Sequence, residues 1–162
     1  MKALKSLFNI LSKFRRTDYE GLSCTAIRSD RNFRKLVKAN LTGMKLKACK
    51  LYSDFTWADF SNSDLSYAEF SDNDLRWANF SNTNLNFTDF CRSDVNSAVF
   101  KDADLRGANL SEVKNLTKQQ LSEAVTDQTT KLPENITLNE VRKAQKDDVN
   151  KTQPDNVIIG HF

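Results

Sequence analysis

Bulky apolar residues recur every five positions along the middle of the chain. The first of these centres is Leu41 and the last is Leu110, and only the step from Leu51 to Phe55 is one residue short. Between them the centres are Leu46, Leu51, Phe55, Phe60, Leu65, Phe70, Leu75, Phe80, Leu85, Phe90, Val95, Phe100 and Leu105. A period of five matches neither the 3.6-residue turn of a helix nor the two-residue repeat of a strand. The pattern therefore predicts a backbone that turns a corner every five residues.

The residues in front of each centre also follow a rule. The second residue before a centre is nearly always small, which suits a side chain that points into a crowded interior. The residue directly before a centre is mostly Asp or Asn, with Lys45, Lys50 and Val99 as exceptions. Short polar side chains of this kind bond to their own backbone and stabilise turns. We therefore interpret these Asp and Asn residues as structural, and assign none of them to a metal site or an acid–base pair.

This five-residue unit resembles the pentapeptide repeat, whose pattern is A-(D/N)-L-x-x. The runs at 58–60, 78–80, 103–105 and 108–110 match it almost letter for letter, and the resemblance covers residues 39–112. It implies an all-β solenoid, the right-handed quadrilateral β-helix, with four five-residue sides and about twenty residues in each coil. Each coil of a solenoid buries its inward residues only against the coils above and below it.

Residues twenty apart then share one side of the column and form ladders. Phe60, Phe80 and Phe100 are expected in one ladder, and Phe70 and Phe90 in the opposite one, continued by Leu110. The predicted structural core is Phe55, Phe60, Leu65, Phe70, Leu75, Phe80, Leu85, Phe90, Val95, Phe100, Leu105 and Leu110.

The two ends do not follow the five-residue pattern. Residues 1–17 predict an amphipathic helix with basic flanks, which either caps the open coil, lies on an anionic membrane surface or mediates self-association. Residues 18–38 are ambiguous: Leu22 and Ile27 suggest a degenerate first coil, and in that frame Leu36 lies out of register.

After Leu110 the five-residue rhythm stops. Residues 113–146 predict two capping helices: a short one within 115–132, with Thr117 as N-cap and Gln120 completing a capping box, and a second one over about 138–146. Residues 147–162 are a polar tail.

Charge is distributed unevenly along the chain. The net charge is +3, yet residues 1–50 carry thirteen Lys and Arg against three Asp and Glu, and residues 51–100 carry two against eight. The acidic segment at residues 51–100 either keeps the outer wall of the column soluble or attracts a binding partner through its electrostatic field. An odd number of cysteines, three, with no secretion signal and no long apolar segment, favours a reducing, cytoplasmic location.

The sequence offers little for catalysis. His161 is the only histidine, the four glycines are scattered, and the cysteines fit no metal spacing. We therefore expect no catalytic residues, no cofactor and no metal, and do not expect an enzyme.

Large aromatic residues also recur at the second outward position of the repeat. They are Trp57, Tyr67, Trp77 and Phe87, and Arg76 is adjacent. Trp57 is expected to stack with Trp77 on one outer face, and Tyr67 with Phe87 on the opposite face. Exposed aromatic residues are enriched in protein interfaces, but outer side chains of a solenoid also stack simply to shield its wall. Both interpretations stay open.

Three functions are compatible with these features. The first is a non-enzymatic scaffold that binds an unidentified protein partner through its flat faces, with self-association also open. The second is implied by the resemblance, since some pentapeptide-repeat proteins mimic DNA and protect DNA gyrase or topoisomerase IV from inhibitors; the short column and the basic first third argue against it. The third is a bacterial effector that binds membranes peripherally. Nucleic-acid binding is disfavoured, because the basic segment contains no recognised module.

Overall fold

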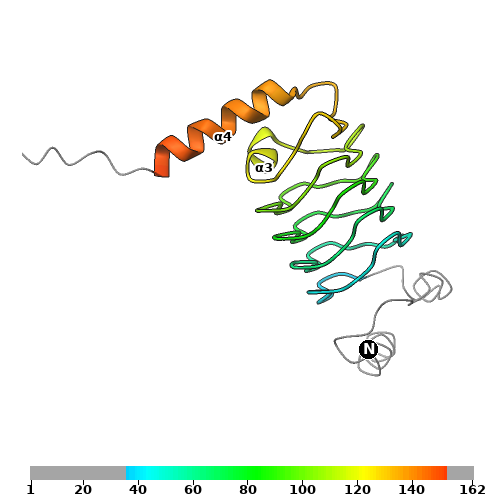
Figure 1. Cartoon of the computed structure of the whole chain (residues 1–162). Coiled ribbons are helices and arrows are strands. Elements are labelled where there is room, and N and C mark those ends of the chain that lie inside the picture. Colours follow the sequence, from blue (N-terminus) through cyan, green and yellow to red (C-terminus); the bar gives the residue numbers. More distant parts are fainter. Residues whose placement is uncertain (1–35, 153–162) are drawn as a thin grey trace, which may run out of the picture.

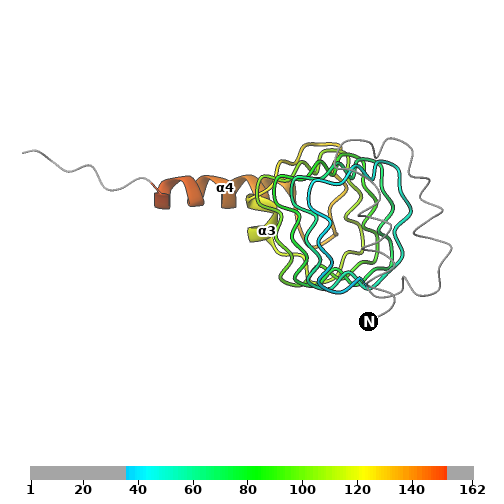
Figure 2. The same ribbon diagram turned by 90° about the horizontal axis from the view of Figure 1, so that it is seen from below.

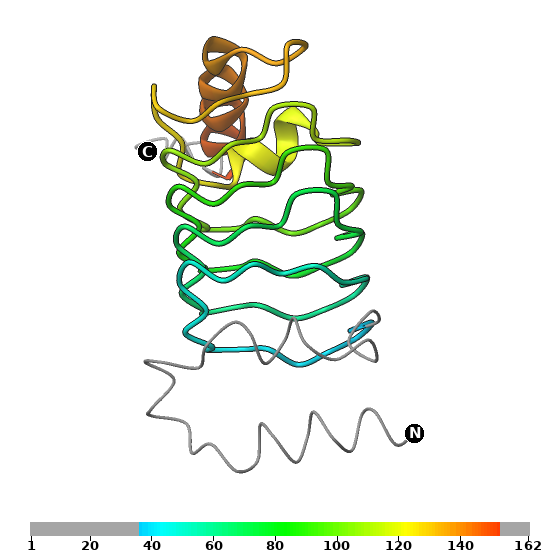
Figure 3. The same ribbon diagram turned by 90° about the vertical axis from the view of Figure 1, so that its right-hand side faces the viewer.

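The computed structural model describes residues 36–152, with side chains as far as residue 146. The described chain winds into a column of stacked coils, and two helices follow at its carboxyl-terminal end (Figure 1). Seen along the column, the coils superimpose into a single four-sided ring (Figure 2). From the side, each coil lies directly above the one before it (Figure 3). This is the corner-turning backbone that the period of five predicts.

Parallel β-bridges hold each coil to the next. For the bridges that start at Asp54 through Asp94, the paired residues are twenty apart, as in Asp54–Asp74 and Asp74–Asp94. In the first described coil the pairs are nineteen apart, as in Asn40–Asp59. The difference equals the residue missing between Leu51 and Phe55, so the short step removes one residue from a coil and leaves the four sides in register.

A tight turn forms each corner. The backbone N–H of Ala58 donates to the carbonyl of Phe55 at 2.8 Å, and Ala78 donates to Leu75 in the same way at 3.0 Å. The second residue inside each turn has a positive φ, as at Trp57 (63°) and Trp77 (57°). A positive φ at this position is the mark of a type II turn, which usually requires Gly or Asn there.

The Asp and Asn residues before the centres stabilise these corners. Asp54 Oδ1 accepts from the backbone N–H of Thr56 at 3.0 Å, and Asn79 Oδ1 accepts from that of Ser81 at 3.0 Å. The same bond recurs around the column, with acceptors Asn40, Asp59, Asp64, Asp74, Asn84, Asp89, Asp94, Asp104 and Asn109. Each satisfies a turn N–H that the coil itself leaves without an acceptor.

The centres fill the interior of the column. All twelve residues of the predicted core, from Phe55 to Leu110, have no exposed surface. Phe80 stacks on Phe60 at 5.1 Å and on Phe100 at 5.3 Å between ring centroids, and Phe70 stacks on Phe90 at 5.4 Å. The two ladders meet edge to face across the axis, at 5.4–6.1 Å. These are the separations and orientations that aromatic pairs prefer.

Small polar residues in the interior bond to the coil below. The hydroxyls of Thr83 and Thr88 donate to the carbonyls of Phe60 and Leu65, each at 2.9 Å. Asn73 donates its amide to two carbonyls, and one of them is that of Phe70, at 2.8 Å. Their polar atoms are thereby satisfied in a dry interior, where an unpaired hydroxyl or amide is costly.

The described column begins earlier than expected. Leu36 is buried, and its N–H donates to the carbonyl of Asp54 at 2.8 Å, so Leu36 is a centre in register with Leu41, which corrects the assignment of Leu36 as out of frame. The predicted helix over residues 1–17, most of the 18–38 segment and residues 153–162 lie outside the described part of the chain.

The strict period ends at Leu110, but the winding continues as far as Leu132. Val125 bridges to Asp104 and Lys131 to Asn109, at spacings of 21 and 22 residues. Thr130 donates to the carbonyl of Leu105 at 3.0 Å, as the inward threonines below it do to theirs. Residues 115–132 are therefore mostly an extra coil with longer corners, and the short helix expected within them occupies only Lys118–Ser122.

Helix α3 (Lys118–Ser122) interrupts this last coil. Thr117 is its N-cap, and Gln120 completes the capping box that the sequence predicts. The amide of Gln120 also donates to the carbonyls of Val95 and Ala98, at 3.0 and 2.8 Å. The side chain thus bonds to acceptors of the coil below at the one side of this coil where no β-bridge forms.

Helix α4 (Leu138–Thr152) follows, and it runs six residues beyond the expected end at residue 146. It contacts the column near its start, where Val141 is fully buried and Gln145 donates to the carbonyl of Ala124 at 3.2 Å. Its remaining turns extend away from the coils (Figure 1). Neither α3 nor α4 is long and apolar enough to span a bilayer.

Candidate interaction surface

Two pairs of stacked aromatic side chains stand on the outside of the column. Trp57 and Trp77, here called the Trp stack, lie parallel, with ring centroids 5.1 Å apart and planes within 5°. Tyr67 and Phe87, the Tyr–Phe stack, lie 5.0 Å apart with planes within 14°. All four side chains are exposed, from 39% for Trp77 to 53% for Phe87.

The turn geometry explains why the rings project outward. Each of the four occupies the positive-φ position of its corner, where a bulky residue is unusual and the backbone conformation costs about 1–2 kcal/mol relative to glycine. The coil repeat sets a second ring at stacking distance directly above or below. Stacking offsets part of the conformational cost, because an aromatic pair contributes about 0.5–1.5 kcal/mol beyond its buried area.

An ion pair supports the Trp stack. Arg76 binds both carboxylate oxygens of Asp74, with Nε at 2.8 Å from Oδ1 and a terminal nitrogen at 2.7 Å from Oδ2. This hydrogen bonding lowers the pKa of Asp74 and raises that of Arg76, despite partial burial of the carboxylate. The guanidinium lies 5.7 Å from the ring centroid of Trp77, within cation–π range.

The same wall carries a row of carboxylates. Asp54, Asp74 and Asp94 lie above one another, since each bridges to the next. Asp94 Oδ1 accepts from the N–H of Asn96 and the amide of Asn115, at 3.0 and 2.9 Å. We call this side the Trp wall and define it by the three aspartates, Arg76, the Trp stack and Ser97.

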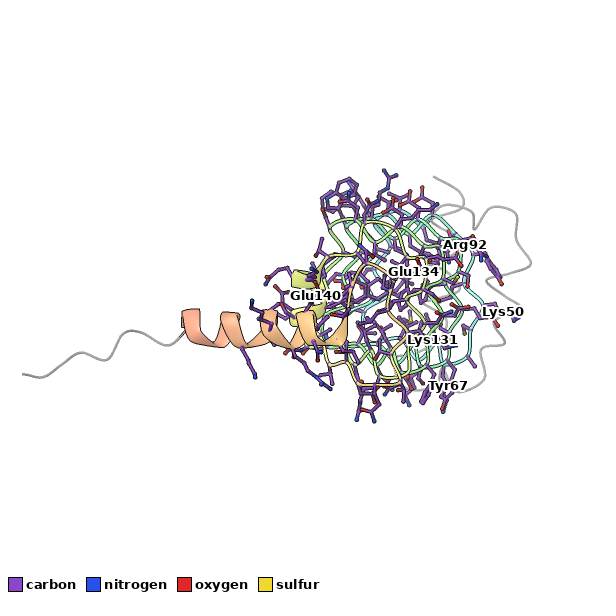
Figure 4. All side chains as sticks on the ribbon, turned by 90° about the horizontal axis from the view of Figure 1, so that it is seen from above. Lys50, Tyr67, Arg92, Lys131, Glu134 and Glu140 are labelled. Atoms are coloured by element: carbon purple, nitrogen blue, oxygen red, sulfur yellow. The ribbon has the colours of Figure 1, made fainter. Side chains whose placement is uncertain are left out.

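The Tyr–Phe stack is bounded by the chain itself at both ends. Lys47 Nζ lies 5.6 Å from the ring centroid of Tyr67. At the other end, a Cβ added to Gly107 would lie 2.5 Å from the Phe87 ring. The ring of Phe87 therefore occupies space that the Cβ of any residue other than glycine would need. Viewed along the column, Tyr67 projects from one wall, and Lys50 and Arg92 from a neighbouring one (Figure 4).

That neighbouring wall carries Cys91 and an ion pair across coils. Arg92 binds both oxygens of Asp72, at 2.8 and 2.7 Å, and approaches the Cys91 thiol at 3.6 Å. Burial is the largest effect on this thiol, and with three nearby carboxylates it raises the pKa of Cys91 despite the guanidinium. A thiol with a raised pKa is a poor nucleophile at neutral pH.

The acidic side chains of the described column serve its turns. Among residues 36–152, no three His, Cys, Asp or Glu side chains are grouped so as to hold a metal ion. The repeated aspartates accept bonds from their own turns, which is the structural role that the sequence predicts for them. What the described surface does offer is flat walls with aromatic and paired charged side chains.

Comparison with known proteins identifies the repeat. The family model of pentapeptide repeats matches residues 53–76 and 74–112, with eight copies. Residues 53–112 of the column are thereby identified as pentapeptide repeats. Proteins of this family form right-handed quadrilateral β-helices, in agreement with the four-sided winding described above. A search of curated proteins finds no match to the chain.

Solved pentapeptide-repeat structures resemble this one. Rfr23 from the cyanobacterium Cyanothece 51142 is 28% identical with a TM-score of 0.52, and the match covers 57% of this chain and 63% of that protein. HetL of Nostoc sp. strain PCC 7120, involved in heterocyst differentiation regulation, is 30% identical with a TM-score of 0.38, covering 54% and 36%. The chain therefore spans less than two thirds of each.

Two features of the surface escaped the sequence analysis. The contact of Phe87 with Gly107 joins residues twenty apart, and the spacing of Gly107 from the aromatic positions is the signal that could have revealed it. The pairing of Arg76 with Asp74 follows from their position on either side of one centre, a spacing that recurs at Asp104 and Arg106.

Proposed function

We propose that this pentapeptide-repeat protein is a non-enzymatic interaction scaffold and that it docks a protein partner on the Trp wall. The observation that supports the proposal is the Trp stack, which holds two indoles parallel and exposed on a flat β-helix side. Trp is among the residues most enriched at binding hot spots, and pentapeptide-repeat proteins are generally structural or interaction proteins.

The Trp wall is preferred to the Tyr–Phe stack because of what lies at the end of each stack. Phe87 already fills the space over Gly107, whereas the coil above Trp77 carries the small, exposed Ser97 at the same position. No further ring stacks on Trp77 from above, and the Arg76 guanidinium lies over the Trp77 ring, so the Trp stack presents both aromatic and cationic groups to a partner. Its aromatic surface is small, roughly 200 Å² if each indole exposes about half of its area, which suits a short docking segment better than a large permanent interface.

An affinity pull-down of the partner from a lysate of the source cell tests this function. The Trp57→Ala/Trp77→Ala protein is expected to lose the partner, and the Tyr67→Ala/Phe87→Ala protein, altered on the opposite wall, is expected to retain it. Both should keep the wild-type far-ultraviolet spectrum, since all four side chains lie outside the core. Equal capture by wild type and the Trp double variant would refute the proposal.

A second candidate is binding to DNA gyrase or topoisomerase IV by DNA mimicry. Residues 51–100 hold eight acidic and two basic residues over two and a half coils. At about 4.8 Å per coil this is roughly one net negative charge per 2 Å of column, close to the density along duplex DNA. Gyrase supercoiling in the presence of a quinolone tests this candidate, which predicts protection; an unprotected reaction together with no binding to the enzyme rejects it.

Peripheral membrane binding depends on residues 1–17, which lie outside the described ranges. Flotation with anionic and neutral liposomes is its direct test.

A further inference from the structure

Cys49 is a buried cysteine that takes part in a disulfide bond. It occupies the inward small-residue position of its coil, the position that Ala68 occupies in the coil above. Its N–H donates to the carbonyl of Leu46 at 3.1 Å, and its carbonyl accepts from the N–H of Glu69 at 2.8 Å. The column therefore holds the backbone on both sides of this sulfur.

The partner of Cys49 follows from the number of cysteines. The chain has three, Cys24, Cys49 and Cys91, and Cys91 carries a free thiol. A bond to a second chain would require the sulfur of Cys49 at the surface, and only 3% of this residue is exposed. Cys24 is the remaining cysteine. It lies outside the described part of the chain, so the number of cysteines alone brings it into this pairing.

We propose that Cys24 and Cys49 form an oxidation site whose disulfide ties the segment before Leu36 to the amino-terminal end of the column. In its formation the two thiols give two electrons and two protons to a disulfide oxidant such as oxidised glutathione, whose own S–S bond breaks to yield two thiols. The new bond closes a loop of about 25 residues. A closed loop removes chain entropy from the unfolded state, which stabilises the fold.

Cys91 is a poor competitor for this bond. It follows the centre Phe90, two coils above Cys49, on the outer side of the column. Thiol–disulfide exchange requires a thiolate, and burial together with nearby carboxylates raises the pKa of Cys91. The odd number of cysteines is thus one bonded pair and one free thiol, and by itself it does not indicate a reducing location.

Peptide mapping tests the pairing. The purified protein is equilibrated with a mixture of reduced and oxidised glutathione, alkylated, and digested with trypsin without reductant. We expect one alkylated cysteine, Cys91, and one pair of linked peptides, residues 17–28 with residues 48–50.

The same equilibration in urea shows whether the fold builds the site. A disulfide that stabilises the fold is itself stabilised by the fold to the same extent. The ratio of oxidised to reduced protein should therefore fall about tenfold or more when the protein is unfolded.

Two substitutions separate the bond from the packing of its residues. Cys24→Ala removes the bond without changing any described side chain, and should lower the urea midpoint by about 1 M. Dithiothreitol should lower the wild-type midpoint by a similar amount and leave that of Cys24→Ala unchanged. Cys49→Ala introduces the residue type that the next coil has at position 68, and should behave like Cys24→Ala. The matched control is Cys91→Ala, which should keep the wild-type midpoint and its response to dithiothreitol.

Three results would overturn the inference. The first is three alkylated cysteines in the folded, equilibrated protein, and the second is a linked pair of peptides that includes Cys91. The third is a urea midpoint of Cys24→Ala that equals that of the wild type or still falls with dithiothreitol. None of these measurements depends on the proposed docking function.

Discussion

At the scale of single residues, the corner position with positive φ carries both the smallest and the largest side chains of the column. Gly43 and Gly107 have φ of +69° and +71°, and Trp57, Tyr67 and Phe87 occupy equivalent positions. The two glycines differ in their surroundings. A Cβ at Gly43 would meet nothing within 4 Å, whereas one at Gly107 would lie 2.5 Å from the ring of Phe87. Comparing Gly43 with Gly107 therefore separates the cost of a positive φ from the cost of a steric clash with the Phe87 ring.

Alanine at these two glycines is expected to destabilise the protein unequally. Gly43→Ala should lower the free energy of unfolding by about 1 kcal/mol through the positive φ alone. Gly107→Ala should cost more, because the Phe87 ring must also move from its stack with Tyr67. Urea unfolding of both variants measures the difference.

Phe87→Ala is the control for this comparison. In that background the extra cost at Gly107 should disappear, leaving two similar losses. A persistent difference would mean that Phe87 is not the source of the conflict.

At the scale of elements, Glu140 joins the two carboxyl-terminal helices. Its carboxylate accepts from the backbone N–H and the hydroxyl of Thr137, both at 2.9 Å, at the start of α4. It also pairs with Lys118 of α3 at 2.5 Å. The Lys118 hydrogen bond, followed by the bonds from Thr137, lowers the pKa of Glu140 from 4.5 to about 2.

This shift predicts how the helix junction responds to acid. A carboxyl group whose pKa is lower in the folded state stabilises the fold above its unfolded pKa, and loses that contribution as the pH falls through the folded pKa. The contribution of Glu140 should therefore be complete above pH 4.5 and disappear as the pH approaches 2. A carboxyl-carbon NMR titration is expected to give a midpoint near 2 in the wild type and a higher one in Lys118→Met. A wild-type midpoint near 4.5 would contradict the contact.

The carboxyl-terminal segment also shows where sequence patterns stop being informative. The capping box at Thr117 was predictable, because it depends on residues three apart in a local motif. The extra coil through Val125 and Lys131 was not, since its spacings of 21 and 22 residues break the period of five. Counting in fives forward from Leu22 and Ile27 misses Leu36, and this led to the wrong prediction that Leu36 is out of register. Counting back from Leu41 reaches Leu36 in one step of five residues.

The candidate site divides in a similar way. Stacking of Trp57 on Trp77 follows from their spacing of twenty once the winding is known. The position of Arg76 over the Trp77 ring does not, because it depends on how the Arg76 side chain folds back to bind Asp74. Such details require atomic positions on the outer wall.

At the scale of the whole molecule, a deletion tests whether coils are interchangeable units. Removing residues 81–100 joins Phe80 to Lys101, which itself follows a centre, so every remaining side chain keeps its side of the column. The shortened protein should fold with the wild-type far-ultraviolet spectrum and an intact Trp stack. Its urea midpoint and m-value should be lower, because one coil interface and its buried surface are lost.

Deletion of residues 81–98 is the matched control. It joins Phe80 to Val99 and moves all later residues two positions out of frame, which turns inward side chains toward solvent. We expect this variant not to fold. Equal stability of the two deletions would show that the period of five does not govern the core.

The bridges between coils have a mechanical consequence. Their hydrogen bonds run parallel to the long axis of the column, with one bridge on each side of the coils from Asn40 to Asp94. A tensile load on the two ends of the column would therefore open the hydrogen bonds of one coil at a time, from an end, without shearing a broad sheet. Each coil that yields frees about 70 Å of extended chain. The column would behave as an extensible spring that lengthens in equal steps under weak force.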